Sequence, residues 1–304
     1  MKRGFLSAIV PDMTFREVME YAAELKMDCV EVACWPVSAA SRRYSGVTHI
    51  DVANLDAEKI SGIRRICRET GVAISAIAYY PNTLDPDSEK RAFNISHLKK
   101  CIDAAQALGV NQVDTFVGKA RDLSVDANLE IFREVWPPIV AYAAERGVRI
   151  AIENCPMYYT ADEFPGGTNL PSSPAIWHRM FEIIPDANFG LNYDPSHLIW
   201  QQIDDVKPLY EFRDHIFHVH FKNVKIDREH LADAGIYDHP ATWQTPKLPG
   251  LGDIDFGAFI CGLYDIGYDS CAVVEVEDRA FEATLESRKQ AVMLSHRYLN
   301  QFLA

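Results

Sequence analysis

The chain has 304 residues, 48% of them hydrophobic, and a formal charge of −13 at neutral pH. These values are typical of a globular protein and exclude a small disulfide scaffold, a coiled coil and a disordered chain. Acidic residues outnumber basic ones by 43 to 30. This excess argues against a nucleic-acid-binding protein, because such proteins usually present a basic face to the phosphates.

The chain begins MKRGFLSAIVPDMTF, a basic dipeptide followed by a short apolar stretch. It lacks the long apolar region and the small-residue cleavage site of a signal peptide. No apolar run approaches the ~20 residues needed to cross a bilayer. The seven cysteines contain no C-x-x-C pair. We therefore expect reduced thiols in a cytoplasmic protein.

The sequence repeats a unit in which a helical pattern ends in glycine and a short apolar strand follows. The unit occurs at 68–79, 105–118, 143–154 and 263–277. Glycine just past a helix supplies the left-handed residue that ends it. The Val/Ile-rich runs that follow are typical of buried parallel strands. Four further strands are expected at 5–10, 28–34, 189–194 and 216–221.

Helical patterns fill the gaps between the predicted strands. Helices are expected at 57–68, 95–108, 127–146 and 281–302, the third kinked or split by Pro137-Pro138. Eight strands alternating with helices predict an α/β fold, a (β/α)8 TIM barrel forming one domain over 1–304. A doubly wound open sheet is the alternative. A dinucleotide-binding version of that sheet is disfavoured, because no G-x-G-x-x-G follows the first strand.

Three predicted strand-to-helix connections are long: 35–56, 155–173 and 222–255. In a barrel they all emerge at the carboxyl-terminal face, where active sites form. They are rich in aromatic and polar residues, and Trp35 is one of these aromatics. We interpret them as walls and a lid over a polar pocket. Surface loops or oligomer contacts are the alternative.

Potential metal ligands stand at the ends of four consecutive predicted strands. They are Glu153, Asp194 with His197, His218 with His220 and Lys222, and Glu275 with Glu277. A charged residue at the end of an apolar run is costly to bury unless it is paired or bound to metal. Parallel neighbouring strands bring these ends together, so the sequence predicts a shared site.

Strand alternation selects among these candidates. His218 and His220 point to the same side of their strand. His220 lies nearer the rim and is the better ligand, whereas His218 lies one layer deeper. Glu275 and Glu277 are alternatives at different depths. We prefer Glu275, because it directly follows the apolar run, as Glu153 does.

Three carboxylates and one imidazole form a mainly oxygen site. Such a site suits Mn²⁺ best, with Mg²⁺ or Co²⁺ as alternatives, whereas a structural Zn²⁺ site would contain more Cys or His. The competing interpretation is a set of buried salt bridges, for which Arg149 and Lys222 are the nearest basic residues. A non-catalytic binding protein without metal also stays open.

Five segments carry a family resemblance: AIENCPM, FGLNYDPSHLIW, IFHVHFKNVKIDRE, LPGLGDIDF and VVEVED. Together they resemble the sugar phosphate isomerase/epimerase family of the xylose isomerase-like barrels, which includes ketose 3-epimerases and inosose dehydratases. The resemblance implies one divalent ion held by Glu153, Asp194, His220 and Glu275. It also implies that His197 binds substrate oxygens.

The resemblance further implies chemistry beside a keto group, through an enediolate. Glu153 and Glu275 would exchange the proton on opposite sides of the carbon. The ketose 3-epimerases carry an arginine six residues after the metal histidine, where this chain has Ile226. That contact is expected to be lost, or to be replaced by Lys222, Lys225 or Arg228, and Trp35 is expected to stack on the sugar.

The reaction outcome stays open at this stage. An isomerase or epimerase of a non-phosphorylated ketose is one reading. A lyase that eliminates a β leaving group from a 3-keto-glycoside or an inosose is the other. The apurinic-site endonucleases of the superfamily need histidines on strands 3 and 4, and AISAIAY and QVDTFVG contain none. The resemblance also favours a homo-oligomer with a small sugar as its ligand.

Overall fold

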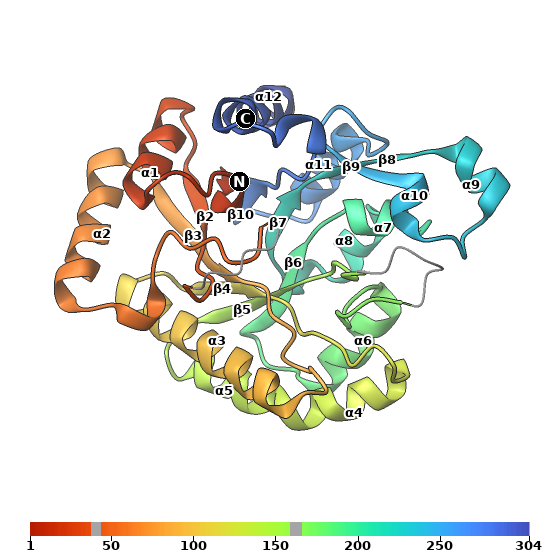
Figure 1. The fold of residues 1–304 in the computed structure, drawn as a ribbon, viewed down its shortest axis with the longest axis horizontal. Coiled ribbons are helices and arrows are strands. Elements are labelled where there is room, and N and C mark those ends of the chain that lie inside the picture. Colours follow the sequence, from red (N-terminus) through yellow and green to blue (C-terminus); the bar gives the residue numbers. More distant parts are fainter. Residues whose placement is uncertain (38–43, 159–165, 304) are drawn as a thin grey trace.

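The computed structural model describes residues 1–37, 44–158 and 166–303. Eight parallel strands close into a barrel in the order β1-β10-β7-β6-β5-β4-β3-β2 (Figure 1). Their bounds are β1 Lys2–Leu6, β2 Cys29–Ala33, β3 Ala73–Tyr79, β4 Gln112–Thr115, β5 Arg149–Glu153, β6 Phe189–Tyr193, β7 Ile216–Phe221 and β10 Cys271–Val274. The predicted TIM barrel is confirmed.

Helices surround the barrel. They are α1 Phe15–Glu24, α2 Ala57–Thr70, α3 Ser88–Leu108, α4 Val125–Val135, α5 Pro137–Ala144, α6 Pro174–Ile183, α7 Ser196–Ile199, α8 Lys207–Glu211, α9 Arg228–Ala234, α10 Pro240–Trp243, α11 Phe256–Asp265 and α12 Leu285–Leu299. Their ends follow local chemistry. The Asp56 side chain accepts from the Lys59 amide to start α2, and Gly71, at φ 72°, ends it.

Several predicted elements differ in their bounds, since α3 begins at Ser88 and not at 95, and α12 spans Leu285–Leu299 and not 281–302. The predicted helix 127–146 is split into α4 and α5, as expected, because a helix-start proline, Pro137, has no amide hydrogen to continue the first helix. The predicted strand 5–10 is wrong in its second half. Strand β1 ends at Leu6, and Ser7–Ile9 forms a short 3-10 turn.

The connection after β7 carries secondary structure of its own. Strands β8 (Asn223–Ile226) and β9 (Gln244–Lys247) form a small antiparallel sheet outside the barrel. Helices α9 and α10 belong to the segment of chain that connects β8 to β9, at the right of Figure 1. The Asn223 side-chain oxygen accepts hydrogen bonds from the amides of Val224 and Ile254, which ties this small sheet to the segment that leads into α11.

The core lies between the outer face of the barrel and its helices, where the largest buried side chains include Trp136, Trp177 and Phe189. Close packing around position 190 in β6 explains why this residue is glycine. A Cβ there would lie well inside contact distance of the His215 carbonyl oxygen, with the Phe217 ring also close.

Within the described residues, each helix is either too short or too polar to span a bilayer. Parts of two long connections, 38–43 and 159–165, lie outside the described residues.

Candidate metal and active site

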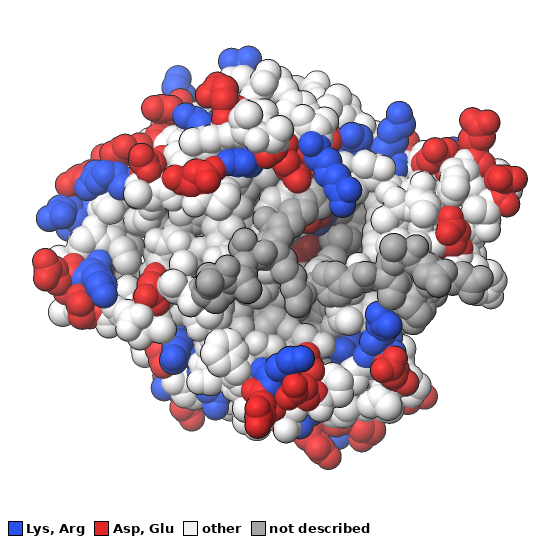
Figure 2. Space-filling view, in the orientation of Figure 1, with Lys and Arg blue, Asp and Glu red and all other residues white. Residues whose placement is uncertain are grey.

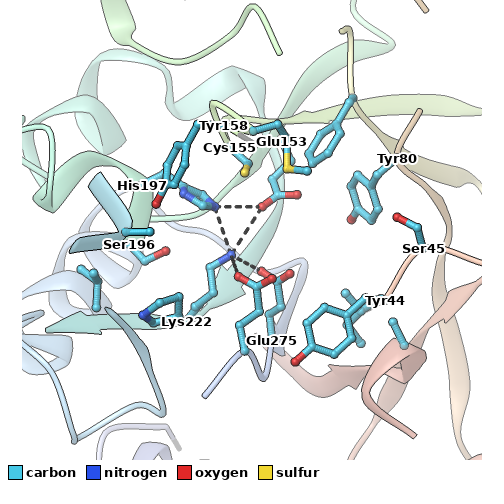
Figure 3. A pocket seen from close by; sticks show the side chains of 18 of the residues that line it. Tyr44, Ser45, Tyr80, Glu153, Cys155, Tyr158, Ser196, His197, Lys222 and Glu275 are labelled. Atoms are coloured by element: carbon cyan, nitrogen blue, oxygen red, sulfur yellow. Dashed lines mark hydrogen bonds and ion pairs between the residues drawn. The ribbon is translucent and has the colours of Figure 1, made fainter. Parts of the chain in front are cut away.

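A pocket of about 530 Å³ opens at the carboxyl ends of the strands. Glu153, His197, Lys222 and Glu275 line its polar part. Figure 2 shows a face that is hollowed near its centre. Figure 3 shows the side chains of these four residues pointing toward one another. The pocket is of the size that binds small molecules.

The four predicted metal ligands come together at the polar end of this pocket. Glu153, Asp194, His220 and Glu275 each offer one ligand atom, and all four atoms lie within 4.8 Å of one another. They come from the ends of β5, β6, β7 and β10, which are neighbours in the barrel. Because the strands are parallel, their carboxyl ends meet at one rim.

Local hydrogen bonds engage one oxygen of Asp194 and leave the other facing the cluster. The Asp194 amide donates to Asn154 Oδ1 (2.8 Å), and Asp194 Oδ1 accepts from the Ser196 amide (2.8 Å) at the start of α7. Asp194 Oδ2 and Glu153 Oε1 are among the buried atoms of the described residues that make no hydrogen bond. The charged or ionisable groups beside them include Lys222 Nζ, 2.9 Å from Asp194 Oδ2, and His197 Nε2, 3.4 Å from Glu153 Oε1. Buried carboxylate oxygens that make no hydrogen bond suit coordination of a cation. With His220 they form an oxygen-rich donor set that fits Mn²⁺, Mg²⁺ or Co²⁺.

The Lys222 ammonium lies inside this cluster. Its Nζ is 2.7 Å from Glu275 Oε2, 2.9 Å from Asp194 Oδ2 and 3.9 Å from Glu153 Oε1. The salt bridges weighed as the alternative to metal therefore exist in the structure, and they are made by Lys222. Arg149 instead donates to Gln112 Oε1 (2.8 Å). A fourth carboxylate, Glu277, lies 3.1 Å from Lys222 Nζ and outside the four-ligand cluster, so it gives the ammonium a partner beside the metal ligands.

These charges set the ionisation of the site. Burial alone would raise the pKa of the Glu275 carboxyl, but the Lys222 ammonium and His220 lower it to about 2. Burial would lower the pKa of Lys222, yet the carboxylates of Asp194 and Glu275 raise it well above its usual value. Glu275 is therefore an anion and Lys222 a cation at neutral pH.

The predicted substrate-binding residues do not all lie at the pocket. His197 Nε2 lies 3.0 Å from Lys222 Nζ and 3.2 Å from Asp194 Oδ2, at the edge of the cluster. Trp35 lines the pocket and contacts Tyr79 edge to face at 5.0 Å. Arg228 is exposed at the start of α9, and it is not among the described residues that line the pocket. We therefore assign no substrate contact to Arg228.

A second polar layer lies beneath the cluster, and the sequence analysis missed its main residue. Glu31, in the middle of β2, places Oε2 2.7 Å from His220 Nε2. His218 lies in this deeper layer, 3.2 Å from Asp114 Oδ2. Glu31 interrupts the apolar run DCVEVAC. A charge in the middle of an apolar strand marks Glu31 as unusual in the sequence, although it does not show that His220 is its partner.

Aromatic residues form the outer wall of the pocket. Tyr158 packs edge to face against Trp200 at 5.6 Å and against His239 at 5.1 Å, and Trp200 contacts Trp243 at 5.9 Å. His239 and Trp243 belong to the connection around α10. The long connections after β5 and β7 therefore do build pocket wall over their described residues.

Residues 19–301 match the family model described as xylose isomerase-like TIM barrel. The chain belongs to this family. Among curated relatives, this xylose isomerase-like protein is 24% identical to the uncharacterized protein YfiH of Bacillus subtilis, over 96% of this chain and 99% of the relative. It is 30% identical to inosose dehydratase of Lacticaseibacillus casei over 133 residues. That match covers 40% of this chain and 43% of the enzyme.

Solved structures resemble this xylose isomerase-like protein over its full length. IolI protein with a bound zinc atom superposes with a TM-score of 0.75 at 16% identity, covering 100% of both chains. D-psicose 3-epimerase, crystallised in the presence of D-fructose, superposes with a TM-score of 0.73 at 13% identity, covering 100% of this chain and 99% of that one. The probable 3-DHS dehydratase AsbF of Bacillus anthracis also gives 0.73, at 16% identity and 99% coverage of both chains. At these identities the likeness shows the fold alone.

Proposed function

We propose that this protein is a divalent-metal-dependent isomerase or epimerase that acts beside the keto group of a non-phosphorylated ketose or keto-sugar. The observation that carries the proposal is the cluster of Glu153, Asp194, His220 and Glu275, whose ligand atoms lie within 4.8 Å. These four residues would hold the ion, with Mn²⁺ as the preferred metal. A bound dication supplies Lewis-acid stabilisation of negative charge on a carbonyl oxygen.

In this proposal the two glutamates would move protons on opposite sides of a carbon atom. Glu153 comes from β5 and Glu275 from the end of β10, and β6 and β7 lie between these strands in the barrel. Both carboxylates are buried or nearly so and face the pocket. One glutamate takes the proton beside the keto group and the other returns it, which inverts the centre.

Two further side chains would stabilise the oxygens of the sugar. His197 lines the pocket beside Asp194 and can hydrogen-bond a substrate oxygen. Lys222 is a buried cation in the same place and can donate to an oxygen that gains negative charge. Among the described pocket-lining residues, Lys222 and Arg279 are the only Lys or Arg side chains. Lys222 is held among carboxylates, and Arg279 is a single side chain and not a basic cluster, so we infer a sugar without a phosphate group.

The outer wall supports a second candidate reaction. Tyr158, Trp200 and His239 extend the pocket beyond the carboxylate cluster, and its volume suits a ligand larger than one sugar ring. In a 3-keto-glycoside, the same proton abstraction would expel the aglycone from the β position. Lys222 could then donate to the departing oxygen. This lyase reaction uses the same glutamate as base and differs only in the fate of the carbanion.

One assay distinguishes the two reactions and tests the proposal. Manganese-loaded protein is incubated with free ketoses, inososes and 3-keto-glycosides in D₂O, and products are followed by NMR and mass spectrometry. Deuterium beside the keto group without cleavage identifies an epimerase or isomerase. Release of aglycone or water identifies a lyase. Absence of both exchange and cleavage across all three classes, at full metal loading, contradicts the proposed function.

A further inference from the structure

A buried carboxylate stands behind the histidine of the metal cluster. Glu31 is in β2 and His220 in β7, and β1 and β10 separate these strands in the barrel. Both side chains are completely buried, and Glu31 Oε2 lies 2.7 Å from His220 Nε2. The contact therefore spans the barrel interior and is not a consequence of strand pairing.

The two nitrogens of His220 face different groups. Nδ1 lies 3.1 Å from Glu275 Oε2 and 3.7 Å from Glu153 Oε1, on the side of the four-residue cluster. Nε2 points the other way, toward Glu31. An imidazole can coordinate a metal only through a nitrogen that carries no hydrogen. The group that accepts a hydrogen from Nε2 therefore decides whether Nδ1 is available as a ligand.

Glu31 is itself held by its neighbours. Its Oε1 accepts a hydrogen bond from the Tyr80 hydroxyl, which follows β3. His218 Nδ1 lies 3.8 Å from Glu31 Oε2. Asn192 places Nδ2 3.1 Å from the Tyr80 hydroxyl and 2.9 Å from His220 Nε2, and its Oδ1 lies 3.2 Å from His218 Nδ1. Turned by 180° about its amide group, the same side chain presents its oxygen to His220 Nε2 and so agrees with a hydrogen on that nitrogen. These contacts fix the carboxylate against the imidazole.

We propose that Glu31 is the positioning residue of the metal centre. It accepts the Nε2 hydrogen of His220, holds the ring plane, and leaves Nδ1, which lies on the side of the four-residue cluster, without a hydrogen and able to coordinate a metal ion. Carboxylates that orient ligating histidines in this way commonly change metal affinity 10- to 100-fold when they are removed. The inference rests on the proposed metal site and adds a residue that does not touch the ion.

The test uses Co²⁺ as the probe and the full-length protein. Affinity is measured by titration, and ligand geometry by the visible absorption of the bound Co²⁺. Glu31→Gln keeps the shape of the side chain but removes its charge, and its NH₂ group can donate to Nε2 and so favour the tautomer that blocks Nδ1. Asp114→Asn is the matched control, because Asp114 is equally buried and contacts Gln112 and His218 instead.

We expect Glu31→Gln to bind Co²⁺ about 10- to 100-fold more weakly with a changed absorption spectrum, whereas Asp114→Asn keeps the wild-type affinity and spectrum. Equal losses in both variants would show a merely structural role and overturn the proposal, as would wild-type Co²⁺ binding by Glu31→Gln. If Glu31→Gln does not fold, Tyr80→Phe, which removes the hydroxyl on Glu31, is judged by the same criteria. Failure of the wild-type protein to bind Co²⁺ would instead contradict the proposed metal site itself.

Discussion

Lys222 Nζ lies 2.7 Å from Glu275 Oε2, inside the group of carboxylates that would bind the metal. The same ammonium is 3.1 Å from Glu277 Oε2, which lies beside that group. One cation is therefore paired with two glutamates on the strand end that supplies the fourth ligand. Charge repulsion couples Lys222 to any dication that enters the cluster.

Removal of the Lys222 ammonium should increase the stabilisation that the protein gains when it binds metal. In Lys222→Met the carboxylates lose their internal cation, so a dication gains attraction and the metal-free form loses an ion-pair network. We expect the difference in melting temperature between manganese-loaded and EDTA-treated protein to be larger than in the wild type. Lys225→Met, at an exposed position of β8, is the control and should leave that difference unchanged. A smaller difference in Lys222→Met would contradict the predicted competition.

Glu153→Gln should abolish proton transfer without loss of the fold. The amide keeps the size of the side chain but cannot accept a proton from carbon, so turnover should fall by about two to four orders of magnitude. Solvent deuterium exchange on the active substrate is the measurement, with far-UV circular dichroism to check the fold. Glu145→Gln, at an exposed glutamate after α5, should keep full activity. Near-normal exchange in Glu153→Gln would remove this residue from the mechanism.

Asn169 should stabilise the connection that carries Glu153. Its Nδ2 donates to the carbonyl oxygens of Glu153 (3.0 Å) and Cys155 (2.7 Å), and its Oδ1 accepts from the Val117 and Gly118 amides. Asn169→Ala leaves these buried backbone groups without partners, which should cost about 2–4 kcal/mol of the free energy of unfolding. Urea denaturation measures this loss.

The matched control for Asn169 is the exposed Asn111. Asn111→Ala should change the free energy of unfolding by less than about 0.5 kcal/mol. Similar values for both variants would show that the four hydrogen bonds of Asn169 carry no special weight.

Two glycines should respond to alanine in opposite directions. Gly190→Ala places a methyl group against the His215 carbonyl and the Phe217 ring, so we expect a loss of about 1–3 kcal/mol in the free energy of unfolding. Gly62 lies within α2, and a Cβ there meets no atom within 4 Å. Gly62→Ala should therefore stabilise the protein by about 0.5–1 kcal/mol. Thermal unfolding of the two variants checks both signs, and destabilisation by Gly62→Ala would contradict the helix argument.

The alternation of strand and helix patterns was sufficient to predict the barrel. It also predicted that Glu153, Asp194, His220 and Glu275 lie close together. Both follow from local patterns, because parallel strands place all their carboxyl ends at one rim. Alternation along β7 also placed His218 below His220, where the structure has it. The ends of helices were predictable where glycine or proline marks them, as at Gly71 and Pro137.

The remaining features depend on contacts that no local pattern encodes. Glu31 reaches His220 across the barrel, between strands that are not neighbours. The position of Lys222 among the carboxylates depends on the path of a long flexible side chain. The small sheet of β8 and β9 pairs segments about twenty residues apart, and its short strands contain charged residues and a proline that hide the strand pattern.

Manganese binding tests the central claim most directly. Wild-type protein and Asp194→Ala, freed of metal by chelation, are titrated with Mn²⁺ and followed by electron paramagnetic resonance of the free ion. We predict one tightly bound Mn²⁺ per wild-type chain and a loss of that binding in Asp194→Ala, with the fold retained. No bound Mn²⁺ in the wild type, or the same binding in both proteins, would contradict a metal centre built from Glu153, Asp194, His220 and Glu275.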